Sequence, residues 1–431
     1  MKKTIHRFLA AVALACPPAA LAQGVPPRMT PAQPGPEQLA PVVPGTNPFP
    51  GPPAPPVVAP HIETLTEAEP ATYAFPLPAY PLTANHFWIG GDFFLAKRQG
   101  TDVPPLVTLA PLPPGNPTPG ALGRPDTTIA FGNRRLNDRF GPGLRVNVGM
   151  FLGDCNLWSI DGNMTALREG KETFTAYGTP TRGVFVPVAS DVPGGPVPFG
   201  FPLFYNLANA SVVVDTQFIG ADANLRYGVV ANDETRIDLM VGYRYMQLKD
   251  GVTLTTTGAN PFLGLGAAFG GPTLDTGDVF KTRNDFHGVN LGVSGVRRLG
   301  ERFTLQGRAT VALGQTYSET QILGTSNFGP AFPLLAPGSG IFAQASNSGT
   351  YRSNRFAVVP EVGIQLGYDL TARVRATFGY TYQYWSKVRR AAEQIDTTTG
   401  IAGVTTGRPL FPDKTTDFSV QGMTFGAELR Y

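Results

Sequence analysis

The sequence contains little cysteine, histidine or charge. It has 2 cysteines and 4 histidines in 431 residues, which argues against a disulfide framework or a zinc site. Charged residues make up 15 % of the chain, well below the roughly 25 % of ordinary soluble domains. The net charge is only +3 and no dense basic run occurs, so we expect no nucleic-acid partner.

Long hydrophobic runs are also missing. No segment approaches the ~18 consecutive apolar residues that a transmembrane helix needs. The sequence has no Cys/His zinc spacing, no Walker loop and no Rossmann fingerprint after a strand, so we expect no metal ion and no cofactor. An exported chain without a membrane helix is then either a soluble β protein or a β-barrel.

The N-terminus has the parts of an export signal. A basic segment containing Lys2 and Lys3 precedes a short apolar segment, and an A-x-A site ends at Ala22. This pattern predicts a signal peptide over residues 1–22. A loose lipoprotein box that ends at Cys16 leaves lipoprotein processing open as the alternative. Cleavage after Ala22 leaves one cysteine in the mature chain, which excludes an internal disulfide.

Residues 23–84 are dominated by proline, alanine, glycine and valine, as in PGTNPFPGPPAPPVVAPH. Proline fixes its own φ angle and has no N–H for a sheet ladder, so this stretch is expected to be extended and to build no core. We interpret it as a disordered or semi-rigid tether that precedes a folded domain at residues 85–431.

From residue 86 onward, apolar and polar residues alternate. In RVRATFGYTYQYW, Val374, Phe378 and Tyr382 fall on one face while Arg373 and Arg375 fall on the other. Side chains alternate faces along a strand, so the pattern predicts strands with one apolar and one polar side. We expect ten strands, near 86–97, 140–152, 156–168, 211–228, 234–249, 279–297, 302–320, 355–369, 372–388 and 415–431.

The connections between these strands alternate strictly between short and long. GDCN, VANDE, RLGE and DLTA are tight turns, and the other five connections are rich in Pro, Gly and Thr. Outer-membrane barrels have an even strand count, short periplasmic turns, long outer loops and aromatic girdles. Tyr and Trp fall at strand ends here, as at Trp88, Trp158, Tyr384, Trp385 and Tyr431.

We therefore expect an all-β fold, a transmembrane antiparallel up-and-down barrel in contact with outer-membrane lipid. It has about ten strands, or twelve if two more lie in the long connections. A soluble secreted β protein is the alternative. The sequence does not indicate an oligomeric state.

The last strand, MTFGAELRY, has the same two faces. Its apolar residues should face lipid, and its terminal pattern resembles the C-terminal signal that the barrel-insertion machinery reads. The residues of that pattern are Thr424, Gly426, Leu429 and Tyr431. We therefore expect the insertion machinery to be a partner of this strand.

Alternation also assigns charged residues to the lumen. About eight strands leave an interior that side chains fill, so ten strands are near the closed limit. Buried charges pair or contact water. The first function that follows is porin-like, passive diffusion of small solutes across the outer membrane through a small pore that prefers anions. The alternative is a structural or surface-binding barrel whose lumen is filled by salt bridges. The lumen-facing set is Asp92, Arg145, Asp161, Asp222, Arg226, Arg236, Asp238, Arg244, Arg308, Glu361, Arg373, Arg375, Glu428 and Arg430.

One pair of residues invites a catalytic interpretation. Asp285 and His287 resemble the Asp-x-His pair of ten-stranded outer-membrane proteases, but no matching Asp-x-Asp pair occurs. Because Val289 and Leu291 should face lipid, alternation puts Asp285 and His287 on the outer face above the membrane. We expect no enzyme, and an outer-membrane hydrolase is a distant alternative.

Three stretches stand out in the first third of the folded part. They are FWIGGDFFLAKRQG with PPLVT soon after, PGALGRPDTTIAFG, and FGPGLRVNVGMFLGDCNLWSIDGNM. They resemble the beta-barrel porin-7 family, whose members often carry a Pro-rich segment after the signal. The resemblance spans residue 86 to the end and implies a porin-like barrel in the bacterial outer membrane, without catalytic residues. The inward acid of the first strand, usually Glu in this family, is Asp92 here.

Overall fold

The chain divides into two units, Met1–Pro78 and Ala79–Tyr431, and all described residues belong to the second. The predicted signal peptide and tether, with Ala22 and Cys16, lie outside the described residues, as does Cys155. No helix among the described residues is long and apolar enough to cross a membrane. The computed structural model describes residues 87–112, 119–153, 156–190, 198–199, 207–259, 273–327, 338–399 and 407–431.

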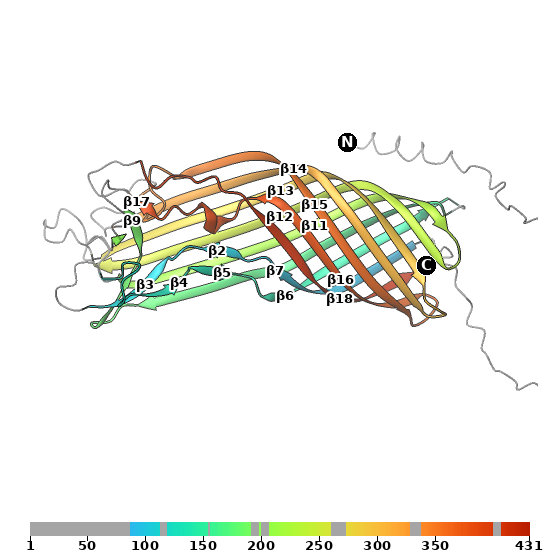
Figure 1. Ribbon diagram of the computed structural model, residues 1–431, viewed down its shortest axis with the longest axis horizontal. Helices are drawn as coiled ribbons and strands as arrows, with labels where there is room; N and C mark the ends of the chain where they lie inside the picture. The colour runs from blue at the N-terminus through green and yellow to red at the C-terminus, as the bar shows by residue number, and fades with distance from the viewer. Residues whose placement is uncertain are drawn as a thin grey trace, which may run out of the picture. The chain divides into compact units, whose positions relative to one another are not determined.

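Ten antiparallel strands close into a barrel (Figure 1). The ring closes where β1 pairs with β18, from Trp88 opposite Arg430 to Arg98 opposite Val420. The prediction of a ten-stranded antiparallel barrel is confirmed. The strands are β1 (Phe87–Arg98), β6 (Phe140–Leu152), β7 (Trp158–Tyr177), β11 (Leu207–Ala231), β12 (Thr235–Ala259), β13 (Thr273–Arg298), β14 (Phe303–Asn327), β15 (Gly349–Asp369), β16 (Val374–Val388) and β18 (Thr416–Arg430).

The alternation of the sequence gives each strand an outer and an inner face. On β12, Leu239 and Val241 are about half exposed on the outside. Met240, which lies between them, and Arg244, further along the strand, are buried on the inside. The other strands repeat this pattern, so the barrel has a continuous apolar outer band. Lipid offers no hydrogen-bond partner to a backbone, and the closed ring leaves no unpaired sheet edge within that band.

Four strands are far longer than a membrane requires. β11 to β14 have 25 or 26 residues, compared with the ~9–11 that cross a bilayer. Figure 1 shows them running past β16 and β18 toward the end with the long connections. The predicted ranges for these strands end too early on that side, because their outer faces become polar there. The ladder continues because their inner faces pack against other parts of the chain.

The ladder between β15 and β16 is the shortest in the ring. It has nine residue pairs and ends where Glu361 lies opposite Gln383, whereas β15 pairs with β14 over almost its full length. Val358 donates its N–H to Ser386 Oγ on the β16 side at 2.9 Å. Pro360 faces the same way, two residues further on, and has no N–H to donate. The proline therefore coincides with the end of the ladder.

The long connections are not structureless, although their composition is typical of loops. β3 pairs with β4 and β8, β2 pairs with β5, and β9 lies between β10 and β17. Such pairings depend on partners far away in the chain, so local alternation does not reveal them. The elements are β2 (Thr101–Val103), β3 (Val107–Pro111), β4 (Thr128–Phe131), β5 (Arg134–Leu136), β8 (Arg182–Phe185), β9 (Val188–Ser190), β10 (Pro198–Phe199), β17 (Thr398–Thr399) and the 3-10 helix η4 (Ala391–Gln394).

The interior has three layers, which can be followed along the inner face of β12. Asp238 and Arg244 line a polar cavity near the short turns. Met246 belongs to an apolar belt in the middle of the barrel. Val252 and Leu254 face a plug, which we define as the inner-wall residues of the outer half together with the segments of the long connections packed on them.

Side chains of the apolar belt meet across the lumen. Phe218 on β11 contacts Phe418 on β18 with ring centroids 5.4 Å apart, and Phe286 on β13 lies 6.0 Å from Trp385 on β16. Neither pair comes from neighbouring strands, so opposite walls meet. The belt consists of Phe94, Ala96, Leu167, Phe218, Met246, Leu248, Phe286, Ala312, Ala357, Val359, Trp385, Val388, Phe418 and Val420.

Trp385 corrects one sequence expectation. Its place at a strand end predicts a position in the aromatic girdle at the membrane surface, but its side chain is fully buried inside the barrel. Tyr382 faces outward and Trp385, an odd number of residues away, faces inward. Its indole Nε1–H donates to Thr316 Oγ1 at 2.9 Å, which satisfies the polar atom of this large side chain inside the belt.

The outer apolar band can be tested with a single charge. Leu291→Arg puts a cation on the lipid face near the middle of the band and is expected to lower the free energy of unfolding by about 2–4 kcal/mol. Thr325→Arg, on the exposed end of β14, should change it by no more than about 0.5 kcal/mol. Denaturant unfolding from lipid vesicles measures both, and equal effects would contradict the assignment.

Candidate functional site: the charged cavity

All ten barrel strands contribute to one charged cavity of about 210 Å³ in the half of the barrel next to the short turns. Among the described residues that line it are seven arginines and six carboxylates. Their near balance means that most of the charge can be neutralised by pairing. They are Arg145, Arg226, Arg236, Arg244, Arg308, Arg375 and Arg430, with Asp92, Asp161, Asp222, Asp238, Glu361 and Glu428.

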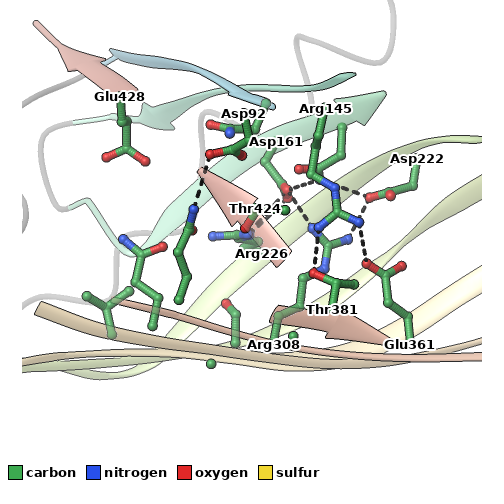
Figure 2. Close-up of a pocket in the computed structure, with 18 of the residues that line it drawn as sticks. Asp92, Arg145, Asp161, Asp222, Arg226, Arg308, Glu361, Thr381, Thr424 and Glu428 are labelled. Carbon is green, nitrogen blue, oxygen red and sulfur yellow. Dashed lines mark hydrogen bonds and ion pairs between the residues drawn. The ribbon is translucent and has the colours of Figure 1, made fainter. Parts of the chain in front are cut away.

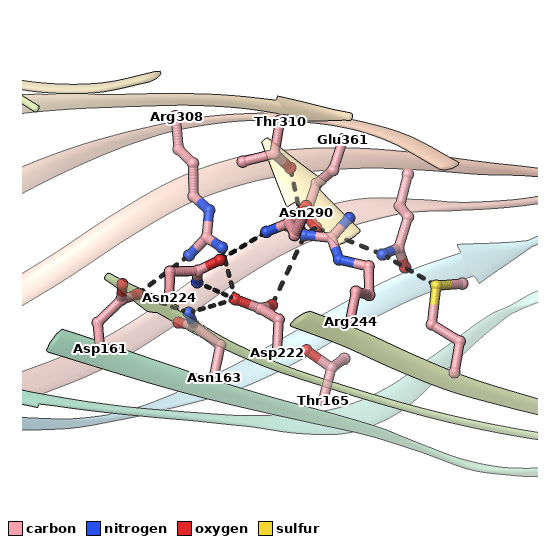
Figure 3. Close-up of polar contacts among 12 residues, drawn as sticks. Asp161, Asn163, Thr165, Asp222, Asn224, Arg244, Asn290, Arg308, Thr310 and Glu361 are labelled. Carbon is pink, nitrogen blue, oxygen red and sulfur yellow. Dashed lines mark hydrogen bonds and ion pairs between the residues drawn. The ribbon is translucent and has the colours of Figure 1, made fainter. Parts of the chain in front are cut away.

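Arg308 connects walls that are not neighbours. From β14 its guanidinium donates to Asp222 Oδ1 on β11 at 2.6 Å and to Asp161 Oδ2 on β7 at 3.4 Å. Figure 3 shows Arg308 reaching both carboxylates. A charge-assisted pair of this kind is short and directional, so it fixes the separation of the strands across the lumen.

Glu361 on β15 is the second junction of the network. Its carboxylate lies 2.7 Å from Arg244 Nη2 on β12 and 3.6 Å from Arg145 Nη2 on β6. Arg145 also donates to Thr165 Oγ1 and Thr381 Oγ1, at 3.1 and 3.0 Å. Figure 2 shows Arg145, Asp222 and Glu361 converging. Glu361 is buried, so its charge depends on these arginines.

Further pairs extend the network toward the short turns. Arg226 forms a bidentate pair with Asp161, at 2.9 and 3.2 Å. Arg236 lies 2.7 Å from Asp238, which is also 3.9 Å from Arg226. The network from Arg236 to Arg145 is therefore continuous across six strands.

Three asparagines complete this network, and sequence reasoning missed them. Asn163 donates to Asp161 and Asp222 at 3.0 and 3.1 Å, and Asn224 donates to Asp222 at 2.6 Å. Asn290 donates to Asn224 at 2.7 Å (Figure 3). Their inward position in the alternation was the available signal, because buried amides need partners as charges do.

The structure brings thirteen of the fourteen predicted lumen residues onto the cavity wall. Arg373 is the exception, because it is exposed in the turn before Val374, the first residue of β16, where strand alternation does not yet apply. Asp92 faces inward as expected. It accepts hydrogen bonds from Thr377 and Gln365, at 2.8 and 3.4 Å, and among the described residues no cation lies within 4 Å of it.

The residues of the predicted insertion signal occupy both faces of β18. Thr424 is buried and lines the cavity, whereas Leu429 and Tyr431 are exposed on the outside. Gly426 lies opposite Asp92 on β1, and a Cβ added at this glycine would lie only 2.1 Å from the Asp92 carboxylate. This close approach explains why position 426 is a glycine, whether or not the insertion machinery recognises it.

Asp285 and His287 lie on the outer wall, as alternation indicated. His287 is exposed and its Nδ1 bonds the hydroxyl of Tyr243, while Asp285 accepts hydrogen bonds from Tyr245, Gln247 and Arg283. Neither residue lines the cavity. Among the described residues there is also no group of three or more His, Cys, Asp or Glu side chains that could hold a metal ion.

The closed sheet, the apolar outer band and the paired interior charges together define a bacterial outer-membrane β-barrel, whose outer wall contacts membrane lipid. The model of the beta barrel porin-7 (BBP7) family matches residues 88–431. The chain belongs to this family. A comparison with curated protein sequences finds no match.

Solved structures of other outer-membrane proteins are similar only at low levels. The outer membrane protease OmpT from Escherichia coli is 11 % identical, with a TM-score of 0.37, and the match covers 81 % of this chain and 98 % of OmpT. A Pseudomonas aeruginosa FadL homologue is 10 % identical, with a TM-score of 0.26 and coverage of 80 % and 89 %. An anion-selective porin from Comamonas acidovorans is 8 % identical, with a TM-score of 0.15 and coverage of 80 % and 100 %.

Removing one carboxylate at the junction tests the network. Glu361→Gln leaves Arg244 and Arg145 without their shared anion in a buried setting, and the free energy of unfolding should fall by about 3 kcal/mol. The matched control, Glu319→Gln, breaks an exposed pair with Arg352 and should cost less than about 1 kcal/mol. Denaturant titration in detergent compares them, and a Glu361→Gln cost no larger than the control's would contradict this role.

Proposed function

We propose that this protein is a closed outer-membrane barrel with a structural or surface-binding function, and that it is not an enzyme. The observation that carries the proposal is the apolar belt, where side chains from opposite walls touch. Water and ions do not pass a fully packed apolar layer, and even open apolar constrictions stop conduction by dewetting. A barrel with this interior is suited to anchoring the long outer connections in the membrane.

The plug adds a second block beyond the belt. After β16 the chain turns inward, and Ala391 and Ala392 of η4 are fully buried against the barrel wall. Arg390 forms a buried salt bridge with Asp250 on β12, and its Nη1 donates to two backbone carbonyls at 3.3 Å. Moving Arg390 away from these partners would leave Asp250 buried without its cation, which is strongly unfavourable. The pair therefore holds this segment in place.

The neighbouring residue holds the same segment to β13. Asn284 Oδ1 accepts the backbone N–H of Arg389, and Asn284 Nδ2 donates to the carbonyl of Arg389, both at 2.8 Å. The Arg389 guanidinium pairs with Asp413 and lies over the ring of Phe411. Two consecutive arginines thus tie the plug to the barrel through both backbone and side chains.

A third fixed point lies beyond η4, outside the membrane-spanning strands. Burial alone would raise the pKa of the Asp396 carboxyl, but donors from Leu410 N–H, Arg408 and Thr398 N–H outweigh it and lower this pKa. The ionised carboxylate therefore stabilises this fold above the ordinary pKa of aspartate, about 3.9. This contribution is lost as the pH falls through the lowered pKa.

The interior is filled differently from the sequence-based hypothesis, in which salt bridges filled the lumen. The salt-bridge network lines the inner half around a cavity, whereas the middle and the outer half are packed mainly with apolar side chains, with the buried Arg390–Asp250 pair among them. This division favours the closed barrel over the pore, because the belt contains no charge that could attract a solute.

Passive diffusion of small solutes remains the second candidate. The porin description of the family favours it, as does the charged cavity of about 210 Å³, which is large enough for several water molecules. Diffusion through this barrel would require the belt aromatics to separate. A hydrolase has no comparable support among the described residues.

Export and assembly belong to the same proposal. We infer that residues 1–22 direct export, with lipoprotein processing at Cys16 as the alternative, and that residues 23–84 form a tether. The insertion machinery would read the end of β18, through the outward Leu429 and Tyr431 together with Thr424 and Gly426. The complete apolar face of this strand supports that role.

Single-channel recording in planar bilayers tests the closed barrel. Heat-modifiable, folded wild-type protein should give no steady openings, because the belt blocks ion passage. Folded protein that conducts steadily would overturn the proposal and establish the diffusion candidate.

The plug can be tested by amide hydrogen exchange. Arg390→Gln leaves Asp250 buried without its cation, so exchange in residues 389–395 should speed up at least tenfold while the ladder from β11 to β13 stays protected. Arg352→Gln, which removes an exposed cation on β15, is the control and should leave residues 389–395 unchanged. Unchanged exchange in Arg390→Gln would show that the pair does not hold the plug.

A further inference from the structure

The outer wall carries a cluster of cations that neither the cavity nor the plug uses. Lys249 on β12 lies directly opposite Arg283 on β13, and Lys281 lies two residues from Arg283 on the same outward face. Arg352 on β15 follows in the same row, separated from Arg283 by Glu319 on β14. We call Lys249, Lys281, Arg283 and Arg352 the cation patch.

The row of residues on the membrane side of the patch fixes its level. Tyr245 and His287 are opposite each other, with ring centroids 5.1 Å apart, and Tyr317 packs edge-on against His287 at 5.8 Å. Below them the outer face is apolar, as at Val289 and Leu313. Amphipathic rings of this kind sit at the boundary between acyl chains and headgroups. The patch is therefore at headgroup level, in the leaflet next to the long connections.

The cations of the patch are close to one another. Directly opposite residues have Cβ atoms about 4.5–5.5 Å apart, and positions two apart on one strand are about 7 Å apart. Like charges at such positions destabilise a sheet. Among the described residues, neither Lys249 nor Lys281 has a carboxylate within 4 Å. This arrangement is favourable when an anion lies between Lys249, Lys281 and Arg283.

Three acids lie near the patch. Glu319 pairs with Arg352, and the Asp215 carboxylate on β11 attracts Lys281 without coming within 4 Å of it, so both leave room for a further anion. Asp285 is already occupied by Tyr245, Gln247 and Arg283, and it takes Nε and Nη2 of the guanidinium at 2.7 and 3.2 Å. That pair leaves Arg283 Nη1 unused by Asp285 and orients the guanidinium, whose side chain is 54 % exposed. A phosphate suits this combination because arginine and lysine both bind its oxygens strongly.

We propose that the cation patch binds the phosphate of a phosphorylated lipid in the outer leaflet, with the aromatic row packing against its glycolipid or acyl part. The phosphate lies between Lys249, Lys281 and Arg283, and Arg352 contributes longer-range attraction. The site is on the lipid-facing wall, so its ligand arrives within the membrane plane. Binding there does not depend on whether the lumen conducts.

The experiment uses the folded full-length barrel in neutral detergent and diphosphorylated lipid A as the probe. Native mass spectrometry or fluorescence titration gives the affinity for wild type and for the triple variant Lys249→Gln, Lys281→Gln, Arg283→Gln. We expect the variant to bind lipid A at least tenfold more weakly, because each contact is charge-assisted. Heat-modifiable migration on gels verifies that both proteins are folded.

A matched variant removes three cations that lie on or just before β1, β6 and β18, on the other side of the ring from β12 and β13. It is Lys97→Gln, Arg139→Gln and Lys414→Gln, and it should bind lipid A as wild type does. Equal loss in both triple variants would overturn the proposal by indicating attraction to net charge. Equal binding of dephosphorylated lipid A would overturn the role of the phosphate. Displacement by millimolar inorganic phosphate alone would indicate a free-anion site and overturn the lipid assignment.

Discussion

The whole structure depends on one constraint: inside a bilayer, every backbone N–H and C=O must find its partner within the protein. The ladder between β1 and β18 meets it by joining the two ends of the folded domain. Once the sheet is closed, each strand has one face toward lipid and one toward a narrow interior. The apolar and polar alternation of the sequence is the consequence of that geometry, and it explains why Tyr431, at the end of the chain, faces outward.

Closure creates a second problem, because ten strands leave little space for water around inward charges. The interior accommodates its inward-facing side chains in two ways. Near the short turns, arginines reach across to carboxylates on distant strands, as Arg308 does toward Asp161 and Asp222. In the middle and outer parts, most inward residues are apolar and meet one another or the returning connections, and buried charges there, such as Asp250, are paired. The largest charged network therefore lies in the part of the lumen that holds the cavity, and the few charges beyond the belt belong to the plug.

Much of this was predictable from local pattern, and the remainder was not. Alternation located the ten strands and the inward charges, and it failed at Arg373, which lies in the turn before β16 begins. The prediction for Trp385 was wrong because it relied on the residue's place at a strand end. Its odd-numbered distance from the outward-facing Tyr382 puts it on the inner face. The plug depends on contacts such as Arg390 with Asp250, 140 residues away, which no local pattern encodes. The inward valines of the outer halves, such as Val252, were the available signal that something apolar had to cover them.

The short ladder between β15 and β16 has a consequence for how the wall yields. Parting any two strands costs the hydrogen bonds that join them, and this seam has only nine residue pairs. Its end at Glu361, beside Pro360, coincides with the inward turn of the chain after β16. We therefore expect mechanical or thermal stress to separate β15 from β16 first, starting at this point and opening the wall toward the acyl chains. The proline thus marks the end of the shortest ladder in the wall.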